Sequence, residues 1–215
     1  MTPLLVVTAV EAEAAAVRAG LGEAATVVAA GAGPAAAAAG AARLLALAEA
    51  GGRPYRAVLC MGIAGGFPGR VPVGGTVVAT RSVAADLGAE TPDGFLAIDE
   101  LGFGTAVHDT DPALVATLRS ALPEAVAGTI LTVSTVTGTS ASTERLMARF
   151  PDAVAEGMEG TGVAEAAGAT PFAEVRTVSN LIGPRDRDAW RIPDALAALT
   201  RAARALATVA RDGEG

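Results

Sequence analysis

Apolar runs of strand length alternate along the chain with longer, alanine-rich stretches of helical character. Residues 57–61 are continuously apolar and residues 4–9 are apolar except for Thr8, which is typical of strands buried on both faces of a sheet. Further strands are expected at 26–30, in the part of 73–80 that follows a Gly-Gly turn, at 129–133 and at 172–178.

Helices are predicted between these strands. The expected positions are 11–18, 35–50, 112–122, 144–149, a short crossover segment after residue 159, and 193–211. Pro34 fits the first turn of the second helix, where no amide hydrogen is needed. The last helix has an apolar stripe (Leu196, Leu199, Ala203 and Leu206) and should cover the sheet. This alternation predicts one three-layer α/β domain over residues 1–215, without a repeat or a linker.

Residues 85–111 are the least regular part of the chain, because acidic residues and glycines interrupt every apolar pattern there. We expect a long functional loop or lid with little secondary structure of its own. His108 lies near its end. It is a candidate acid–base group, although its neighbours Asp109 and Asp111 favour a surface residue that caps the next helix.

Composition and charge narrow the class of protein. The 215 residues carry a net charge of -7, and no basic cluster is present, which argues against nucleic acid and anionic membranes as partners. One cysteine, Cys60, allows no disulfide within the chain, and one cysteine with one histidine is too few for a usual zinc site. The start lacks a basic flank and no apolar run is long enough to span a bilayer, so we expect a cytoplasmic protein.

Two acidic residues, Glu11 and Glu13, follow the first buried strand. Open α/β sheets bind ligands outside the carboxyl ends of their strands, so these carboxylates are site candidates. Their spacing of two places them on different faces of the following turn, and only one is expected to point inward. The alternative is that both are first-turn acids that the helix dipole favours.

The stretch 156–190 holds a second set of polar side chains. Glu159 lies at a glycine-flanked helix start, and the strand at 172–178 runs directly into Ser179 and Asn180. The loop that follows contains Arg185 and Arg187. A strand end of this kind is a candidate ligand site, and the alternative is a helix terminus followed by a salt-bridged surface loop.

Two glycine-rich segments, 31–33 and 62–66, also follow predicted strands. The first is a poor match to a dinucleotide-binding fingerprint, because its acidic partner, Glu49, falls at the end of a helix rather than of a strand. The second either lets backbone amides approach a ligand or forms a tight turn. The hydroxyl-rich segment 134–140 suits a helix cap and a polar pocket equally well.

The order of these segments resembles the purine nucleoside phosphorylase and nucleosidase superfamily over nearly the whole chain. Six segments carry the resemblance: 8–13, 31–33, 62–66, 73–78, 158–159 and 176–180. It implies a three-layer sandwich whose mixed central sheet is flanked by helices. It also implies a small-molecule nucleoside substrate, no metal or organic cofactor, and a homo-oligomer.

Within that superfamily the chain looks most similar to hydrolases of methylthioadenosine and to futalosine hydrolases. Asn180 stands where the adenine-specific enzymes have an aspartate that protonates the purine N7. A neutral amide cannot protonate N7, but it can hydrogen-bond N7 and O6 of a 6-oxopurine. Segment 180–187 and Trp190 also resemble futalosine hydrolases. The resemblance implies cleavage of futalosine, an inosine-like nucleoside with a carboxybenzoyl extension, to hypoxanthine in the alternative menaquinone pathway.

The resemblance also assigns expected roles. Glu13 would activate the attacking water and Asn180 would stabilise the leaving base. The other expected contacts are to the substrate: Glu159 and Met158 at the ribose, Ser179 beside Asn180, Gly65 and Thr137 in the pocket wall, and Arg185 and Arg187 toward the carboxylate.

Two other functions stay open at this point: a nucleosidase for methylthioadenosine or S-adenosylhomocysteine, and a non-catalytic purine nucleoside-binding protein. Phosphorolysis would need a basic phosphate cradle. We expect no basic residue near segments 31–33 or 62–66, which favours hydrolysis instead.

Overall fold

The computed structural model describes residues 4–212, with side chains to residue 207. Its strands are β1 (Leu4–Thr8), β2 (Ala25–Ala29), β3 (Ala57–Gly66), β4 (Thr76–Ala84), β5 (Gly88–Thr91), β6 (Gly94–Ala97), β7 (Val107–Asp109), β8 (Val126–Thr132), β9 (Ala153–Gly157) and β10 (Phe172–Leu181). Its α-helices are α1 (Glu11–Leu21), α2 (Pro34–Ala50), α3 (Pro112–Ala121), α4 (Ser140–Arg149), α5 (Gly160–Ala167) and α6 (Ile192–Asp212), and short 3-10 turns lie at Gly22–Ala24 and Arg187–Ala189.

The central sheet is mixed and partly closed on itself. Its strands follow the order β10-β4-β8-β9-β3-β1-β2, β7 pairs with β4, and β10 pairs also with β3. The pairs β1–β2, β1–β3, β3–β10, β4–β8 and β8–β9 are parallel, whereas β4–β10, β3–β9 and β4–β7 are antiparallel. The second pairing of β10 closes β3, β10, β4, β8 and β9 into a ring. The expected mixed sheet is confirmed, and this closure is a feature that the sequence pattern did not indicate.

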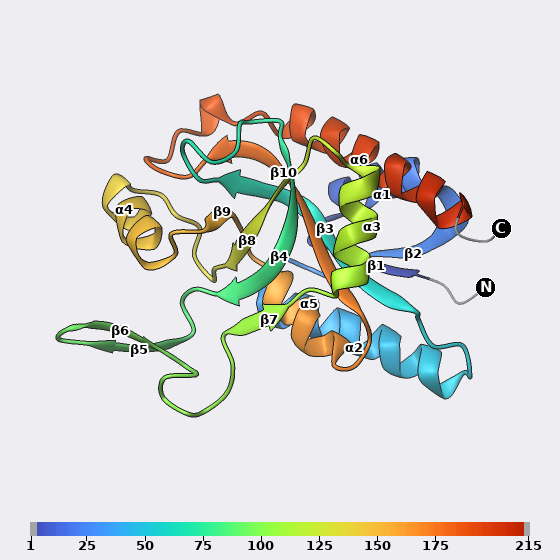
Figure 1. Ribbon diagram of the computed structural model, residues 1–215, viewed down its shortest axis with the longest axis horizontal. Helices are drawn as coiled ribbons and strands as arrows, with labels where there is room; N and C mark the ends of the chain where they lie inside the picture. Colours follow the sequence, from blue (N-terminus) through green and yellow to red (C-terminus); the bar gives the residue numbers. More distant parts are fainter. Residues whose placement is uncertain (1–3, 213–215) are drawn as a thin grey trace.

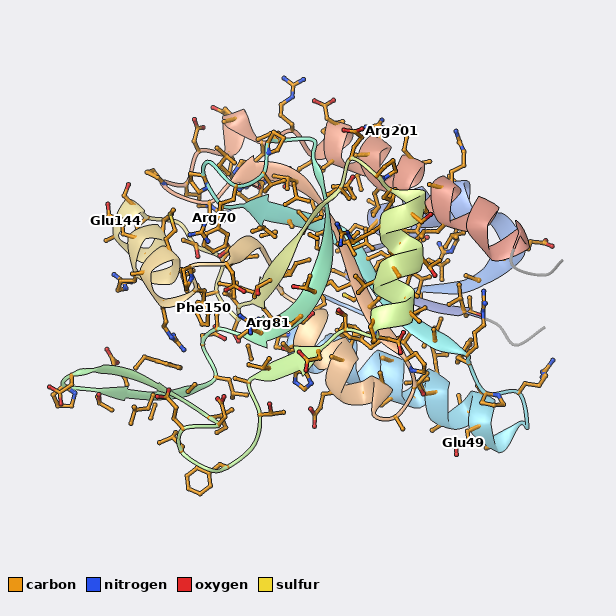
Figure 2. All side chains as sticks on the ribbon, viewed as in Figure 1. Glu49, Arg70, Arg81, Glu144, Phe150 and Arg201 are labelled. Atoms are coloured by element: carbon orange, nitrogen blue, oxygen red, sulfur yellow. The ribbon has the colours of Figure 1, made fainter. Side chains whose placement is uncertain are left out.

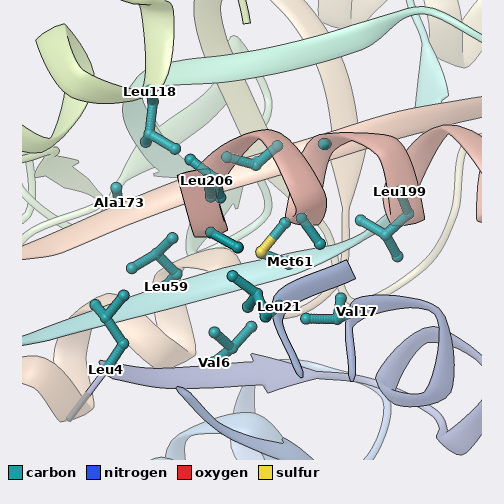
Figure 3. Close-up of a cluster of buried hydrophobic side chains, with 14 of the residues drawn as sticks. Leu4, Val6, Val17, Leu21, Leu59, Met61, Leu118, Ala173, Leu199 and Leu206 are labelled. Atoms are coloured by element: carbon teal, nitrogen blue, oxygen red, sulfur yellow. The ribbon is translucent and has the colours of Figure 1, made fainter. Parts of the chain in front are cut away.

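Helices cover both faces of the sheet (Figure 1). Helices α1, α3 and α6 pack on one side, where a large apolar cluster joins them to β1, β3 and β10. Figure 3 shows part of this cluster, including Leu4, Leu59, Met61, Leu199 and Leu206. Helices α2 and α5 enclose a second cluster on the other side. The three-layer arrangement and the apolar stripe of the last helix are therefore confirmed.

Helices α1 and α6 approach each other closely because Gly20 has no side chain. A Cβ atom at this position would lie 2.5 Å from the Cβ of Ala203 and 2.5 Å from the carbonyl oxygen of Thr200. A Cβ atom essentially never comes within 3.0 Å of a non-bonded atom, so a larger residue at 20 would separate the two helices. Since α1 carries Glu13, this packing also fixes where that carboxylate lies.

Several strands are longer than the sequence predicted. The segment 62–66 is neither a turn nor a loop, since it continues β3 in register with β10. Its glycines make room for neighbouring side chains: a Cβ at Gly62 would lie 2.7 Å from the Glu13 carboxylate, and one at Gly66 would lie 2.8 Å from Val178. Strand β10 likewise extends through Asn180 to Leu181. Strand β9, in segment 153–157, was not predicted at all.

The expectation that 85–111 has little regular structure was wrong in part. Strands β5 and β6 form an antiparallel hairpin that projects from the body of the molecule (Figure 1), and β7 extends the central sheet beside β4. His108 lies in β7, with 16% of its side chain exposed and its Nε2 3.7 Å from a Glu165 oxygen. It does not cap α3, because Asp111 accepts the hydrogen bonds from the first turn of that helix.

Candidate active site

A cavity of about 240 Å³ opens where β1, β3, β9 and β10 end. Eight of the nine predicted site residues line it: Glu13, Gly65, Thr137, Met158, Glu159, Ser179, Asn180 and Arg185. Arg187 is the exception, because it lies on the exposed 3-10 turn and does not reach the cavity wall. The structure thus brings eight of the predicted residues together at one cavity and leaves Arg187 outside its wall, and which of them contact a substrate stays a prediction.

Glu13 is held rigidly by three backbone amides. Its Oε2 accepts hydrogen bonds from the amides of Ala9 (2.9 Å) and Val10 (3.2 Å), and its Oε1 accepts one from Ile63 (2.8 Å). The side chain is only 3% exposed, whereas Glu11 is exposed and pairs with Arg18. The prediction that one of the two acids points inward is confirmed. A carboxylate has about four lone-pair sites, so Oε1 keeps one free to accept a hydrogen bond inside the cavity.

Glu159 is the cavity-facing member of a buried ionic cluster. Its Oε1 accepts from the amide of Gly33 at 3.1 Å, and its Oε2 lies 3.0 Å from Nη1 of Arg176. Arg176 also donates from Nε to Glu174 at 2.8 Å, and Glu174 in turn accepts from Ser82. One guanidinium thus faces two carboxylates, so the cluster as a whole carries a net negative charge, and Glu159 is the member that lines the cavity.

Arg176 holds this cluster together and was not predicted to belong to the site. It is 1% exposed. Burial alone would lower its pKa, but Cys60, Glu174, Glu159 and Glu13 around it together outweigh burial and raise the pKa well above its ordinary value, so the guanidinium stays charged. Its Nη1 lies 3.4 Å from the carbonyl oxygen of Ile63. The expectation that no basic residue lies near segment 62–66 is therefore wrong, because Arg176 approaches the segment in space and Arg70 follows it closely along the chain.

Arg176 is nevertheless unsuited to cradle a phosphate. Its side chain does not line the cavity, and Glu174 and Glu159 already neutralise it. Glu174 and Arg176 are spaced by two in a buried strand, so they share one face of it. Two opposite charges in that pattern are the sequence signal of a buried ion pair, and this signal was overlooked.

Ser179 and Asn180 lie at an irregularity in β10. The register with β3 shifts between Val178 and Asn180, as it does at a β-bulge, a feature that redirects side chains near active sites. Ser179 Oγ lies 2.8 Å from Asn180 Oδ1 and 3.2 Å from the carbonyl oxygen of Ala64. Asn180 Nδ2 donates to the Leu181 carbonyl oxygen at 3.0 Å. The amide keeps one N–H free for a ligand.

Glu156 was missed as a site residue, although it lines the cavity and is 4% exposed. Its Oε1 accepts from the amide of Thr137 (2.8 Å) and its Oε2 accepts from the Thr137 hydroxyl (2.6 Å). Burial raises the pKa of Glu156 above its ordinary value, and the hydrogen bonds from Thr137 offset part of that rise. The short apolar run 153–155 before it could have indicated β9 and hence a strand-end carboxylate.

Arg185 and Trp190 form one side of the cavity mouth. Both residues line the cavity, and the Arg185 guanidinium carbon lies 5.1 Å from the centre of the Trp190 ring, within range of a cation–π contact. The backbone amide of Arg185 donates to the Gly138 carbonyl oxygen at 3.2 Å, which ties this loop to the segment that carries Thr137. An aromatic surface and a cation therefore adjoin at the entrance.

The dinucleotide alternative finds no support in the geometry. Glu49 is exposed near the C-terminal end of α2 and lies well away from the strand ends that form the cavity (Figure 2). Gly33 donates its amide hydrogen to Glu159. Among residues 4–212, no group of three or more His, Cys, Asp or Glu side chains could hold a metal ion, and no helix is long and apolar enough to cross a membrane.

Comparison with known proteins gives two kinds of match. The family profile described as "Phosphorylase superfamily" matches residues 6–212. The chain is 46% identical to the futalosine hydrolase of Acidothermus cellulolyticus, over 98% of this chain and 93% of that protein. It is 56% identical to the futalosine hydrolase of Streptomyces coelicolor, over 74% of this chain and 68% of that protein.

A solved structure has the same fold. The methylthioadenosine/S-adenosylhomocysteine nucleosidase of Colwellia psychrerythraea, in complex with adenine, superposes with a TM-score of 0.80 over 97% of this chain and 95% of that one. The two sequences are 22% identical, so this likeness concerns the fold alone.

Proposed function

Because the chain belongs to the phosphorylase superfamily and, within it, to the futalosine hydrolases, we infer that it is an N-glycosyl hydrolase that cleaves futalosine. Water replaces the base at C1′: the C1′–N9 bond breaks, a C1′–OH bond forms, and the proton lost by the water ends on the released hypoxanthine. The observation that carries the assignment to this cavity is that Glu13, Glu159 and Asn180 all line it.

Glu13 is suited to act as the general base that receives a proton from the attacking water. Three amide donors fix the carboxylate, and the free lone pair on Oε1 is available to a water molecule in the cavity. A positioned base of this kind contributes roughly 10² to 10⁴ in rate.

Glu159 is suited to contact the ribose of the substrate. Its carboxylate belongs to a buried cluster with a net negative charge, and the transition state of glycosidic cleavage gathers positive charge on the sugar. Met158 lies beside it in the cavity wall and offers an apolar surface for the ribose.

Asn180 is suited to contact the leaving group, which is the purine base. Ser179 and the Leu181 carbonyl group fix the orientation of its side chain. Its free N–H can donate a hydrogen bond to a base with acceptors at O6 and N7, which favours a 6-oxopurine as the leaving group. An amide donor stabilises the negative charge that develops on a 6-oxopurine without transferring a proton.

The cavity mouth supports recognition of the carboxybenzoyl group. Trp190 presents an aromatic face for the benzoyl ring, and Arg185 can bind its carboxylate with the paired N–H groups of the guanidinium. The homo-oligomer that the superfamily implies stays a prediction, which light scattering of the purified protein will test.

The decisive experiment measures hypoxanthine release from futalosine in phosphate-free buffer, followed by chromatography. We expect equimolar hypoxanthine and free dehypoxanthinyl sugar, at a rate that added phosphate does not change. Release that depends on phosphate, or a phosphorylated sugar product, would show a phosphorylase instead.

A further inference from the structure

Glu174 is a fully buried carboxylate that the proposed chemistry does not use. It lies in β10 with 0% of its surface exposed, and it does not line the cavity. Its Oε1 accepts a hydrogen bond from Nε of Arg176 at 2.8 Å, and its Oε2 accepts one from the buried hydroxyl of Ser82. Apolar residues in place of a buried ion pair are often as stable or more stable, so this pair calls for a reason other than stability.

Glu174 fixes which edge of the Arg176 guanidinium faces Glu159. With Nε bonded to Glu174, Nη1 lies 3.0 Å from Glu159 Oε2. Nη1 also lies 3.4 Å from the carbonyl oxygen of Ile63, and Nη2 lies 3.2 Å from Sγ of Cys60. The guanidinium is planar and rigid, so a carboxylate that anchors Nε also sets the directions of the other two nitrogens.

Two glycines near Glu159 make room for this arrangement. A Cβ atom at Gly157 would lie 2.9 Å from Cζ of Arg176, and one at Gly160 would lie 2.6 Å from Cδ of Glu174. Both distances are shorter than real Cβ contacts, so neither position accepts a side chain while the two charged groups stay in place. The segment that carries Glu159 therefore packs directly on the Glu174–Arg176 pair.

We propose that Glu174 is a positioning residue for the sugar chemistry, which orients Arg176 and offsets its charge so that Glu159 acts within a cluster of net negative charge. Without the charge of Glu174, the guanidinium and Glu159 would form a neutral pair, whose electric field at the sugar is weaker. Positive charge develops on the sugar in the transition state, so the loss should fall mainly on kcat. The proposal deepens the inferred hydrolysis and rests on the ribose contact of Glu159.

Glu174→Gln is the test variant, because it removes the charge with little change in shape. The Gln oxygen can accept from Nε of Arg176 and its NH₂ group can donate to the hydroxyl oxygen of Ser82, so the cluster can keep its hydrogen bonds. At an effective dielectric constant of about 20, a unit charge on the order of 10 Å from the sugar changes the rate roughly tenfold. We expect kcat to fall by about this factor and KM to change little.

Ser82→Ala is the matched control. It removes one hydrogen bond to the same carboxylate but leaves the charge of Glu174 and its contact with Arg176 in place. It should lower the melting temperature, because a buried acceptor loses its donor, and keep the kcat of the unmodified protein. If Ser82→Ala reduces kcat as much as Glu174→Gln does, then Glu174 only holds the core together and the proposal is wrong.

A double-mutant cycle with Glu159→Gln shows whether Glu174 acts through Glu159. Glu174→Gln should lower kcat about tenfold when Glu159 is present and have little further effect in the Glu159→Gln protein. A purely structural role would reduce kcat by the same factor in both proteins. Losses that multiply in this way would overturn the proposal.

The cycle is measured with futalosine, inosine and methylthioadenosine, because all three carry the ribose ring on which Glu159 would act. Cleavage of another nucleoside but not of futalosine, with the coupling between Glu174 and Glu159 intact, would overturn the inferred substrate alone. Cleavage of futalosine without that coupling would overturn the role of Glu174 alone. No cleavage of any of the three would overturn both.

Discussion

Replacing Glu13 by Gln tests the role of this carboxylate and has two separable effects. One carboxylate oxygen becomes an NH₂ group, yet three backbone amides point at the two oxygens. The side chain would keep its remaining oxygen toward Ala9 and Val10, which leaves the amide of Ile63 facing another donor. An unsatisfied buried donor costs about 1–3 kcal/mol of unfolding free energy.

The stability effect translates into a melting temperature lowered by roughly 2–12 °C, since 1 kcal/mol shifts a domain of this size by about 2–4 °C. The turnover effect should be far larger, with kcat reduced about 10²- to 10⁴-fold because the variant has no base to receive the proton of water. Differential scanning calorimetry measures the first effect. Hypoxanthine release, assayed well below the melting temperature, measures the second.

Glu11→Gln is the control, because Glu11 is exposed and its pairing with Arg18 is a surface ion pair. Such pairs contribute at most about 1 kcal/mol, and this variant should keep the turnover of the unmodified protein. A Glu13→Gln protein that turns over normally, or a Glu11→Gln protein that is inactive, would refute the assignment of the base to Glu13.

Three further predictions follow from the same geometry. Glu159→Gln should reduce kcat more than it changes KM, because its charge acts mainly in the transition state; steady-state kinetics in which only KM changes would contradict this. Arg185→Ala should weaken kcat/KM for futalosine much more than for inosine, whereas Arg187→Ala should affect neither, and equal losses on both substrates with Arg185→Ala would remove the carboxylate contact. Burial raises the folded-state pKa of Glu156 above its ordinary 4.5, so its favourable contribution is present at lower pH and is lost as pH rises through the raised value. The melting temperature of the unmodified protein should therefore fall relative to Glu156→Gln as pH rises from 4.5, and a difference that is constant or has the opposite sign would contradict this.

The sequence predicted those parts of the fold that depend on local patterns. The apolar run predicts β1, the proline predicts the start of α2, and the apolar stripe predicts that α6 packs on the sheet. Each of these patterns is typical of one kind of structure. Segment 62–66 was ambiguous for a physical reason. Its glycines suit a turn, and only the packing of Glu13 against Gly62 and of Val178 against Gly66 explains why a strand needs them.

The residues of the site also fall into two groups: those that local sequence patterns predict and those that depend on contacts between distant parts of the chain. Glu13, Glu159 and Asn180 follow strand or helix boundaries that the sequence marks clearly, and they line one cavity. Glu156 and Arg176 depend on contacts across long distances along the chain: Glu156 on the pairing of β9 with β3, and Arg176 on its approach to Glu159. The difference between Arg185 and Arg187 depends on the path of an irregular loop, which no periodicity describes.

The most direct test of the account compares kcat/KM for futalosine and for methylthioadenosine, on the unmodified protein and on Asn180→Asp. We predict that the unmodified protein cleaves futalosine and leaves methylthioadenosine nearly untouched, because a neutral amide cannot protonate N7 of adenine. Asn180→Asp should move the preference toward methylthioadenosine, at a low overall rate. Efficient cleavage of methylthioadenosine by the unmodified protein would contradict the account.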